Sequence, residues 1–331
     1  MGVDGRMIAH IAEACFWLFR YLERIETTAR LINMNHVFIL DGENSQEDSW
    51  KPIIKLNGQG KIYEKIYKEK GYGNDSLACQ FLTWEEQNPE SIFNAFKNQR
   101  ENARSIRDTI SSELWNALNG FWLWLTLGEG KELYNKNKYL FYEEIIENTN
   151  KLRGIFYCSM RQEEAFEFIN VGMMLERALQ TARILLIKIE GNKKENLHEF
   201  QGRYWLALLK IFCANESFLK CPYYDLTRES VSEFLIFENS YPRAILFCLK
   251  HALISFSKIR NYVNIENYTK SEIELSTLMD NLEHCSKLSY INAGLNQHLK
   301  ELVLKIENIC VQIQVDFFYK QFDELYSNIS G

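Results

Sequence analysis

Two stretches of the chain carry nearly the same eleven residues. Residues 20–30 read RYLERIETTAR and residues 173–183 read MMLERALQTAR, so that six of the eleven aligned positions are identical. In both stretches apolar residues recur at intervals of three and four, which is the spacing of one face of an α-helix. The sequence therefore predicts two related helices, separated by about half the length of the chain.

A second pair of similar segments follows the first at the same separation. Residues 81–92 read FLTWEEQNPESI and residues 234–245 read FLIFENSYPRAI, and both pairs are 153 positions apart. A constant offset between separate segments is typical of an internal duplication. We therefore expect two tandem, pseudo-symmetric helical halves, residues 1–153 and 154–331, that together form one continuous bundle.

The rest of the chain also has a helical pattern. Only four prolines and 16 glycines occur in 331 residues, so few positions interrupt a helix. Both repeated helices are apolar almost all round, which is typical of the central helices of a bundle. Further helices are predicted over residues 76–86, 89–110, 112–127, 129–153, 200–215, 228–238, 242–260, 270–289 and 296–327. Because strand patterns are scarce, the predicted fold class is all-α, a helical bundle.

Charge and composition argue against several classes of protein. A net charge of −6, from 38 basic and 44 acidic residues, argues against a general nucleic-acid-binding protein, which needs a basic surface. No uncharged apolar run approaches about 18 residues, so no membrane span is expected. The eight cysteines are scattered without a CxxC pair, which predicts a reducing compartment and a cytoplasmic protein. The oligomeric state is left open.

Known catalytic and metal-binding motifs are scarce. The sequence contains no GxGxxG, Walker A or GxSxG motif, and its six histidines form no ligand cluster along the chain. A single ExxH, Glu195-Asn196-Leu197-His198, lies in a polar stretch and has no second copy, whereas di-iron bundles need two. We therefore expect neither a metal site nor a cofactor.

The Glu-Arg pair inside each repeated phrase needs a different explanation. Side chains of adjacent helical residues diverge by about 100°, so Glu23 and Arg24 cannot pair with each other. Charges on so apolar a helix need partners, because an unpaired buried charge costs several kcal/mol. Two explanations stay open. Glu23 and Glu176 either pair with arginines and fix the register of the helices, or they line a polar cavity between the halves.

In the first explanation the arginines come from neighbouring helices or from the same helix, as Arg30 and Arg183 do. In the second, arginines bind an anionic group and glutamates orient an amine or act as acid–base catalysts. The candidate catalytic residues are Glu23 and Glu176. The candidate binding residues are Arg20, Glu23, Arg24, Arg30, Arg100, Arg104, Glu176, Arg177 and Arg183.

Arg100, Arg104 and Arg107 share one face of a predicted helix, at i, i+4 and i+7. A solvated face is the simpler interpretation. A face that meets Glu23, Glu176 or an acidic ligand is the alternative.

Five segments in a fixed order resemble a known family. YLERIETTAR, SWKPII, NPESI, RENAR with ELWNALN, and MRQEEAFEFINVGMMLERALQTARILL are similar to the bacterial Alpha-E domain family, a tandem α-helical domain with a Glu-Arg motif. The chain departs from that pattern at Phe19, where a glycine is usual, and at Met173, where an arginine is usual. Glu26 of the first phrase is replaced by Leu179 in the second, so the two halves are not equivalent.

The resemblance implies a functional setting. Alpha-E domains are associated with ATP-grasp-type carboxylate–amine ligases, transglutaminase-like proteins and N-terminal-nucleophile peptidases. It therefore implies an accessory or substrate-presenting role in a peptide synthesis or modification system. The alternative is a stand-alone enzyme or binding protein that uses glutamates and arginines in a cleft.

Overall fold

The computed structural model describes residues 7, 9–40, 46–68, 71–191, 198–262 and 267–319. Every regular element in these residues is a helix, which confirms the all-α prediction. No helix in these ranges combines the length and the apolar character needed to cross a bilayer. All eight cysteines are free, and Cys15, Cys79, Cys248 and Cys310 are buried.

The helices form two sets along the chain, α1 to α8 and α9 to η3. The first set comprises α1 (Ala9–Leu40), α2 (Gln46–Lys55), α3 (Gly60–Tyr67), α4 (Asp75–Thr83), α5 (Ile92–Ser105), α6 (Ser112–Thr126), α7 (Glu129–Lys136) and α8 (Lys138–Ser159). The second set comprises α9 (Glu164–Gly191), α10 (His198–Ile211), α11 (Asn215–Leu219), α12 (Arg228–Phe237), α13 (Ile245–Tyr262), α14 (Lys270–His284), α15 (Lys287–Asn292) and α16 (Leu295–Ile313), which continues as the π-helix η3 (Gln314–Tyr319).

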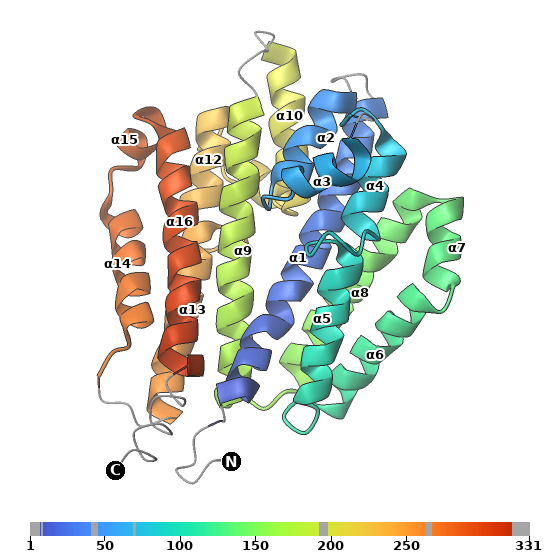
Figure 1. Ribbon diagram of the computed structural model, residues 1–331. Coiled ribbons are helices and arrows are strands. Elements are labelled where there is room, and N and C mark those ends of the chain that lie inside the picture. The colour runs from blue at the N-terminus through green and yellow to red at the C-terminus, as the bar shows by residue number, and fades with distance from the viewer. Residues whose placement is uncertain are drawn as a thin grey trace.

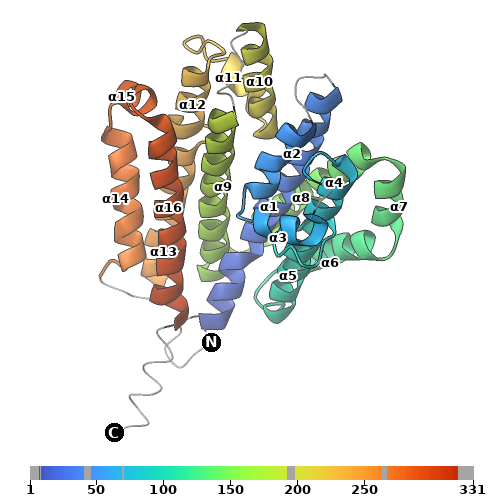
Figure 2. The ribbon, with the colours of Figure 1, turned by 45° about the horizontal axis from the view of Figure 1, so that its top comes forward.

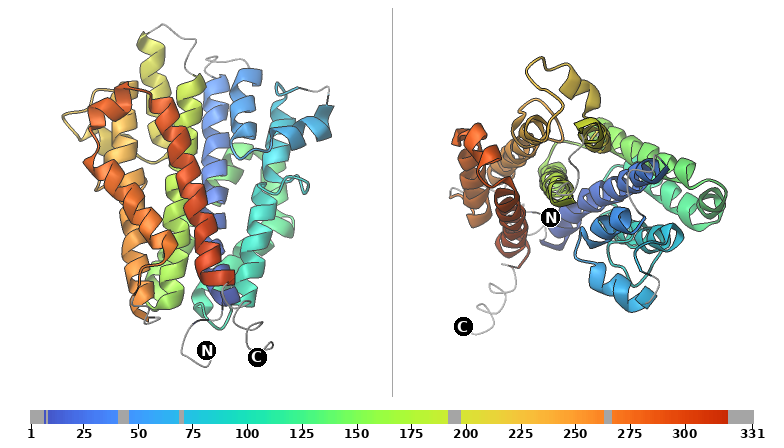
Figure 3. Two further views of the ribbon diagram at one scale, coloured as in Figure 1. Left: turned by 60° about the vertical axis from the view of Figure 1, so that its left-hand side comes forward. Right: turned by 90° about the horizontal axis from the view of Figure 1, so that it is seen from above.

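The two repeated phrases lie on α1 and α9, the two longest helices described, and these helices pack against each other along the middle of the molecule (Figure 1). Helix α1 also packs against α5 and α8, whereas α9 also packs against α13 and α16. Figure 2 shows α13, α14 and α16 on one side of α9, with α5 and α6 on the far side of α1. Seen from above, α1 and α9 lie in the middle of the bundle, with other helices on several sides of them (Figure 3). The expected central position of the repeated helices is confirmed.

Gly172 is where α9 comes closest to α1. A Cβ atom at this position would lie 1.9 Å from the carbonyl oxygen of Phe16 on α1, which is far inside van der Waals contact. The corresponding position of the first phrase is Phe19, which is buried and packs on Phe156 with ring centroids 4.8 Å apart. The close approach therefore depends on α9 alone: the space left by Gly172 is occupied by the backbone of α1 at Phe16.

We expect Gly172→Ala to destabilise the protein, because the added methyl group has to push two backbones apart. Overpacking of a core costs about 1–3 kcal/mol, and this contact involves backbone that cannot rotate away. Gly154→Ala is the matched control, since a Cβ there meets no atom within 4 Å and alanine favours a helix by about 0.5–1 kcal/mol. Urea unfolding of both variants tests this, and equal stability of the two would contradict it.

The structure corrects the boundaries of four predicted helices. The helix predicted over 89–110 begins at Ile92, because the hydroxyl of Ser91 accepts from the backbone N–H of Asn94 and caps it. The side chain of Asn88, which precedes the predicted start, donates to the carbonyl of Phe81 and accepts from the N–H of Glu90. The segment predicted as one helix over 129–153 is two helices.

Asn137 separates those two helices. It ends α7 in an extended conformation, with φ −157°, and its side chain caps the start of α8 by accepting from Leu140 N–H. Similarly, the segment predicted over 270–289 is divided at Cys285 and Ser286, and Ser286 caps α15. The helix predicted over 296–327 runs from Leu295 to Ile313 before the π-helix, and its residues 320–327 lie outside the described residues.

Candidate functional site

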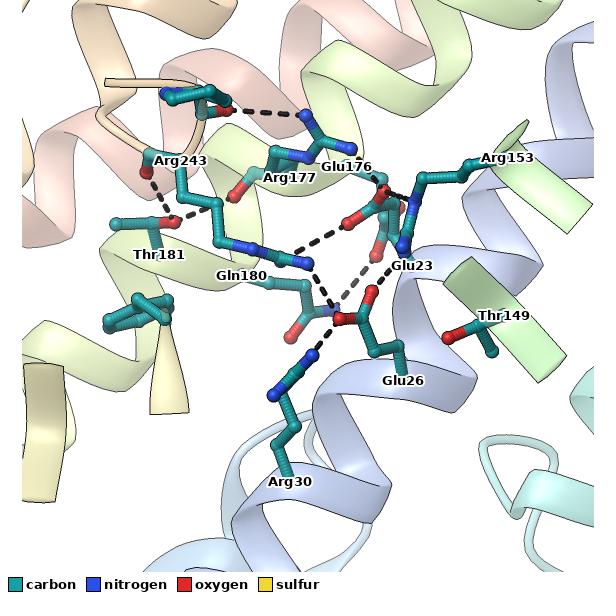
Figure 4. A network of polar contacts seen from close by, with 12 residues as sticks. Glu23, Glu26, Arg30, Thr149, Arg153, Glu176, Arg177, Gln180, Thr181 and Arg243 are labelled. Atoms are coloured by element: carbon teal, nitrogen blue, oxygen red, sulfur yellow. Dashed lines mark hydrogen bonds and ion pairs between the residues drawn. The ribbon is translucent and has the colours of Figure 1, made fainter. Parts of the chain in front are cut away.

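The strongest concentration of buried charge lies between α1 and α9. Glu23 and Glu26 of α1 and Glu176 of α9 have no solvent-exposed surface. A buried carboxylate is stable only when several hydrogen-bond donors surround it. The arginines that provide these donors come from four separate segments of the chain (Figure 4).

Glu176 is held by two arginines of α1. Its carboxylate accepts from Arg20 Nε at 2.9 Å and from Arg24 Nε at 2.8 Å, and Gln180 on the next turn of α9 donates to it at 2.8 Å. Arg24 also donates to Glu90, at the start of the segment leading into α5, at 2.9 Å. This group therefore contains as many carboxylates as guanidinium groups.

Glu23 is held by three arginines from outside α1. Its carboxylate accepts from Arg177 Nη2 of α9 at 2.7 Å and from Arg153 Nε of α8 at 3.0 Å. Arg243, in the segment just before α13, lies 3.4 Å away. Arg177 is fixed further by a hydrogen bond of 3.2 Å to the carbonyl oxygen of Pro242.

Glu26 shares two of those arginines. It accepts from Arg243 Nη2 at 2.7 Å and from Arg30 Nε, one turn along α1, also at 2.7 Å. Arg153 donates to its second oxygen. Glu23 and Glu26 together thus face four guanidinium groups, which leaves an excess of positive charge in this group of residues.

The two Glu-Arg pairs are exchanged between the helices. Arg177 of the second phrase binds Glu23 of the first, and Arg24 of the first phrase binds Glu176 of the second. Because adjacent residues of a helix diverge by about 100°, neither glutamate pairs with the arginine next to it. The observed contacts match the first of the two explanations left open by the sequence, pairing with arginines of neighbouring helices.

The arginine partners favour the ionised form of the three buried carboxylates, Glu23, Glu26 and Glu176. Burial alone would raise the pKa of Glu176, but the guanidinium groups of Arg24 and Arg20 outweigh it and hold that pKa well below its usual range. Burial likewise opposes ionisation of Glu23 and Glu26, and their arginine partners lower both pKa values. A carboxylate that is ionised, paired and inaccessible is a poor general acid or base in this conformation.

The other predicted site residues lie apart from this network. Arg183 pairs with Glu307 of α16 at 2.5 Å and with Asn57 at 2.9 Å, and all three line a cleft between α2, α9 and α16. Arg100 donates to Asn119 at 3.0 Å, whereas Arg104 is largely exposed.

Arg100 and Arg104 both also contact Glu101, and the guanidinium of Arg107 lies over the ring of Trp115. The structure does not bring Arg100, Arg104 or Arg107 together with Glu23 or Glu176. The solvated-face interpretation therefore describes them better. Glu195, of the single ExxH motif, lies outside the described residues.

Four residues of the network were not among the candidate site residues predicted from the sequence. Glu26, Glu90, Arg153 and Arg243 all bind members of the two repeated phrases. Glu90 and Arg243 directly follow the prolines of the second repeated pair and are separated by the same 153 positions. These matching positions could have identified both residues as candidates. Arg153 carries no such signal.

This arrangement defines a class of protein: an all-α bundle whose two central helices each carry a Glu-Arg pair, exchanged as ion pairs at the core. The comparison with known families agrees. A family model named Alpha-E, described as a predicted alpha-helical domain with a conserved ER motif, matches residues 7–318. The chain belongs to the Alpha-E family. No curated protein and no solved structure matches the chain significantly.

We expect Glu176→Gln to lower the free energy of unfolding by about 3–5 kcal/mol, because it leaves Arg20 buried without a counter-charge and Arg24 paired with Glu90 alone. The control is Glu216→Gln on α11, whose exposed carboxylate should contribute less than about 0.5 kcal/mol. Urea unfolding monitored by circular dichroism measures both. An unchanged midpoint for Glu176→Gln would show that the network does not hold the helices together.

The lowered pKa values also predict an acid sensitivity. Unfolded glutamates have a pKa of about 4.3, so the unfolded chain binds protons that the folded chain does not, and stability falls as pH falls below about 5. Glu176→Gln lacks one of these groups, so its stability should depend less steeply on pH. Unfolding free energies measured between pH 7 and about pH 3 test this, and parallel curves for the two proteins would contradict it.

Proposed function

We propose that this chain is an accessory or scaffold protein of a peptide synthesis or modification system, and that it docks on, or presents substrate to, an ATP-grasp-type carboxylate–amine ligase. The observation that carries the non-catalytic part of this proposal is the complete burial of Glu23, Glu26 and Glu176 among arginines. The charged motif is used inside the molecule, so a role in chemistry is not needed to explain it. The partner classes, including transglutaminase-like proteins, rest on the resemblance to the family.

An exposed apolar face supports a docking role. Leu304, Val311, Val315 and Tyr319 follow one another at steps of seven, four and four along α16 and η3, and all four are exposed. The opposite face of α16 is buried in the core through residues such as Ile306. An apolar stripe of this kind is more typical of an interaction surface than of a solvated helix.

We also infer that the bundle is an internal duplication. Moving the bounds of α4 by 153 positions gives 228–236, against Arg228–Phe237 for α12, and moving those of α5 gives 245–258, against Ile245–Tyr262 for α13. Helix α8 similarly corresponds to α16. The expected boundary at residues 153 and 154 lies inside α8, so we propose to move it to residues 160–163, between α8 and α9.

A second candidate function, binding of a small anionic ligand, is favoured by the excess of guanidinium groups around Glu23 and Glu26. Arg177 has a buried Nε atom without a hydrogen-bond partner. The side chains of Arg30, Arg153 and Arg243 keep between 12% and 16% of their surface accessible, so solvent reaches the edge of this group. A bound anion would neutralise part of the excess charge.

Affinity purification of the full-length protein from its native host, followed by mass spectrometry, separates the two functions. Stoichiometric recovery of an ATP-grasp-type ligase is the expected result. We further expect Val311→Glu to abolish that recovery, because it puts a charge in the middle of the exposed stripe. Leu288→Glu, at an exposed leucine of α15, is the control and should leave it intact.

Recovery of the protein alone, with an anionic small molecule bound, would overturn the accessory role in favour of the second function. Equal recovery of the ligase by Val311→Glu and Leu288→Glu would instead leave the partner in place and exclude the stripe as its docking surface.

A further inference from the structure

Three side chains of metal-binding types meet at one end of α1, away from the Glu-Arg network. His36 lies near the end of α1, and Asp75 and Cys79 lie on α4. Asp75 and Cys79 are four residues apart, so they occupy the same face of their helix. From the sequence we expected that no histidine belongs to a metal-ligand cluster. The cluster was not predicted because His36 is far from Asp75 and Cys79 along the chain, so no short spacing indicates it.

The three ligand atoms are close to one another. Nε2 of His36 lies 2.9 Å from Oδ1 of Asp75 and 3.4 Å from Sγ of Cys79, and one ligand atom from each residue lies within 4.8 Å of the other two. A tetrahedral zinc ion has bonds of about 2.0–2.3 Å, which separate its ligands by about 3.3–3.8 Å. The His36–Asp75 pair would need to open by only a few tenths of an ångström to admit a cation.

The surroundings are suited to a site with one open position. Cys79 is buried, whereas 19% of the His36 side chain and 33% of the Asp75 side chain are exposed, so water can reach the carboxylate. The buried ring of Trp50 meets the imidazole edge-on, with centroids 5.5 Å apart, and restricts its orientation. Three protein ligands with a water in the fourth position is a common arrangement for zinc.

We propose that His36, Asp75 and Cys79 bind one divalent cation of the zinc class, with water as the fourth ligand. Thiolate, imidazole and carboxylate together favour zinc or cobalt over magnesium or calcium, which prefer oxygen ligands alone. Binding requires the thiolate, so Cys79 releases its proton to solvent as the Sγ–metal bond forms. No oxidation or reduction is involved.

Lys138 is the competing group at this site. Its ammonium lies 3.4 Å from Oδ2 of Asp75, and the imidazole of His36 also contacts that carboxylate. Burial raises the pKa of the Cys79 thiol to about 12 when no cation is bound. Nε2 of His36 either donates to the Asp75 carboxylate or accepts from the Cys79 thiol, and it cannot do both at once. The experiment has to separate the ion pair of Asp75 and Lys138 from a metal site.

The test is titration of the full-length protein, first treated with a chelator, with Co²⁺ alone. We expect one equivalent of Co²⁺ to bind and to be displaced by Zn²⁺. The bound Co²⁺ should show visible absorption bands with the intensity typical of tetrahedral coordination, and a near-ultraviolet thiolate-to-cobalt charge-transfer absorption. Cys79→Ala and Asp75→Asn, which change little volume, should each weaken binding by at least about 100-fold, since even loss of an outer-shell partner costs 10–100-fold.

Two further variants complete the test. Cys158→Ala removes an exposed thiol elsewhere, on α8, and should keep both the stoichiometry and the thiolate absorption. Lys138→Met removes the competing ammonium and should tighten Co²⁺ binding. Circular dichroism of each variant verifies that it is folded.

Absence of Co²⁺ binding, or binding without thiolate absorption, would overturn the proposal. The same conclusion would follow if folded Cys79→Ala bound Co²⁺ as the unaltered protein does. Loss of the absorption in Cys158→Ala would assign the thiolate to a different place. None of these outcomes depends on whether the protein recruits a ligase, so this proposal and the proposed function can fail separately.

Discussion

The exchange of ion pairs between α1 and α9 allows charged side chains to occupy the middle of an apolar bundle. Removing an ion from water costs several kcal/mol, and the cost is offset only when each carboxylate has well-placed cationic donors. Glu176 has two arginine partners, and Glu23 has three. Sliding one helix along the other by a single turn, about 5.4 Å, would break these contacts at once. The network therefore fixes the register of the two central helices.

The polar and apolar parts of this interface depend on each other. Gly172, Glu176 and Gln180 lie on successive turns of α9 and face α1. The missing side chain at Gly172 lets the helices approach until backbone nearly touches backbone. One turn further on, the same closeness brings Arg20 within 2.9 Å of Glu176. A wider separation of the helices would leave both the core unfilled and the charges unpaired.

Much of this architecture could be predicted from the two repeated phrases. The spacing of their apolar residues predicted two helices, and the absence of a polar face predicted that both are central. Both properties depend only on the local sequence. One partner of Glu23, Arg153, could not be predicted in the same way. Arg153 comes from α8, and only the packing of α8 against α1 brings it close. The break at Asn137 was missed because one capping side chain interrupts an otherwise continuous helical pattern.

The proximity of His36, Asp75 and Cys79 could not be predicted from the sequence for a similar reason. Two elements supply them, and no local spacing connects His36 with the other two. By contrast, Glu90 and Arg243 were within reach, because they occupy matching positions of the second repeated pair. Their charges are opposite, although their positions in the two segments match.

The origin of the arginines has a consequence for the integrity of the chain. If the chain were cut between α8 and α9, the fragment with α1 would keep Glu23 and Glu26 but lose Arg177 and Arg243. The fragment with α9 would keep Glu176 but lose Arg20 and Arg24. Each piece would carry ionised groups whose counter-charges lie on the other, so neither has a complete core of its own. Complementary charge would favour reassembly of the two pieces with each other over self-pairing of either one.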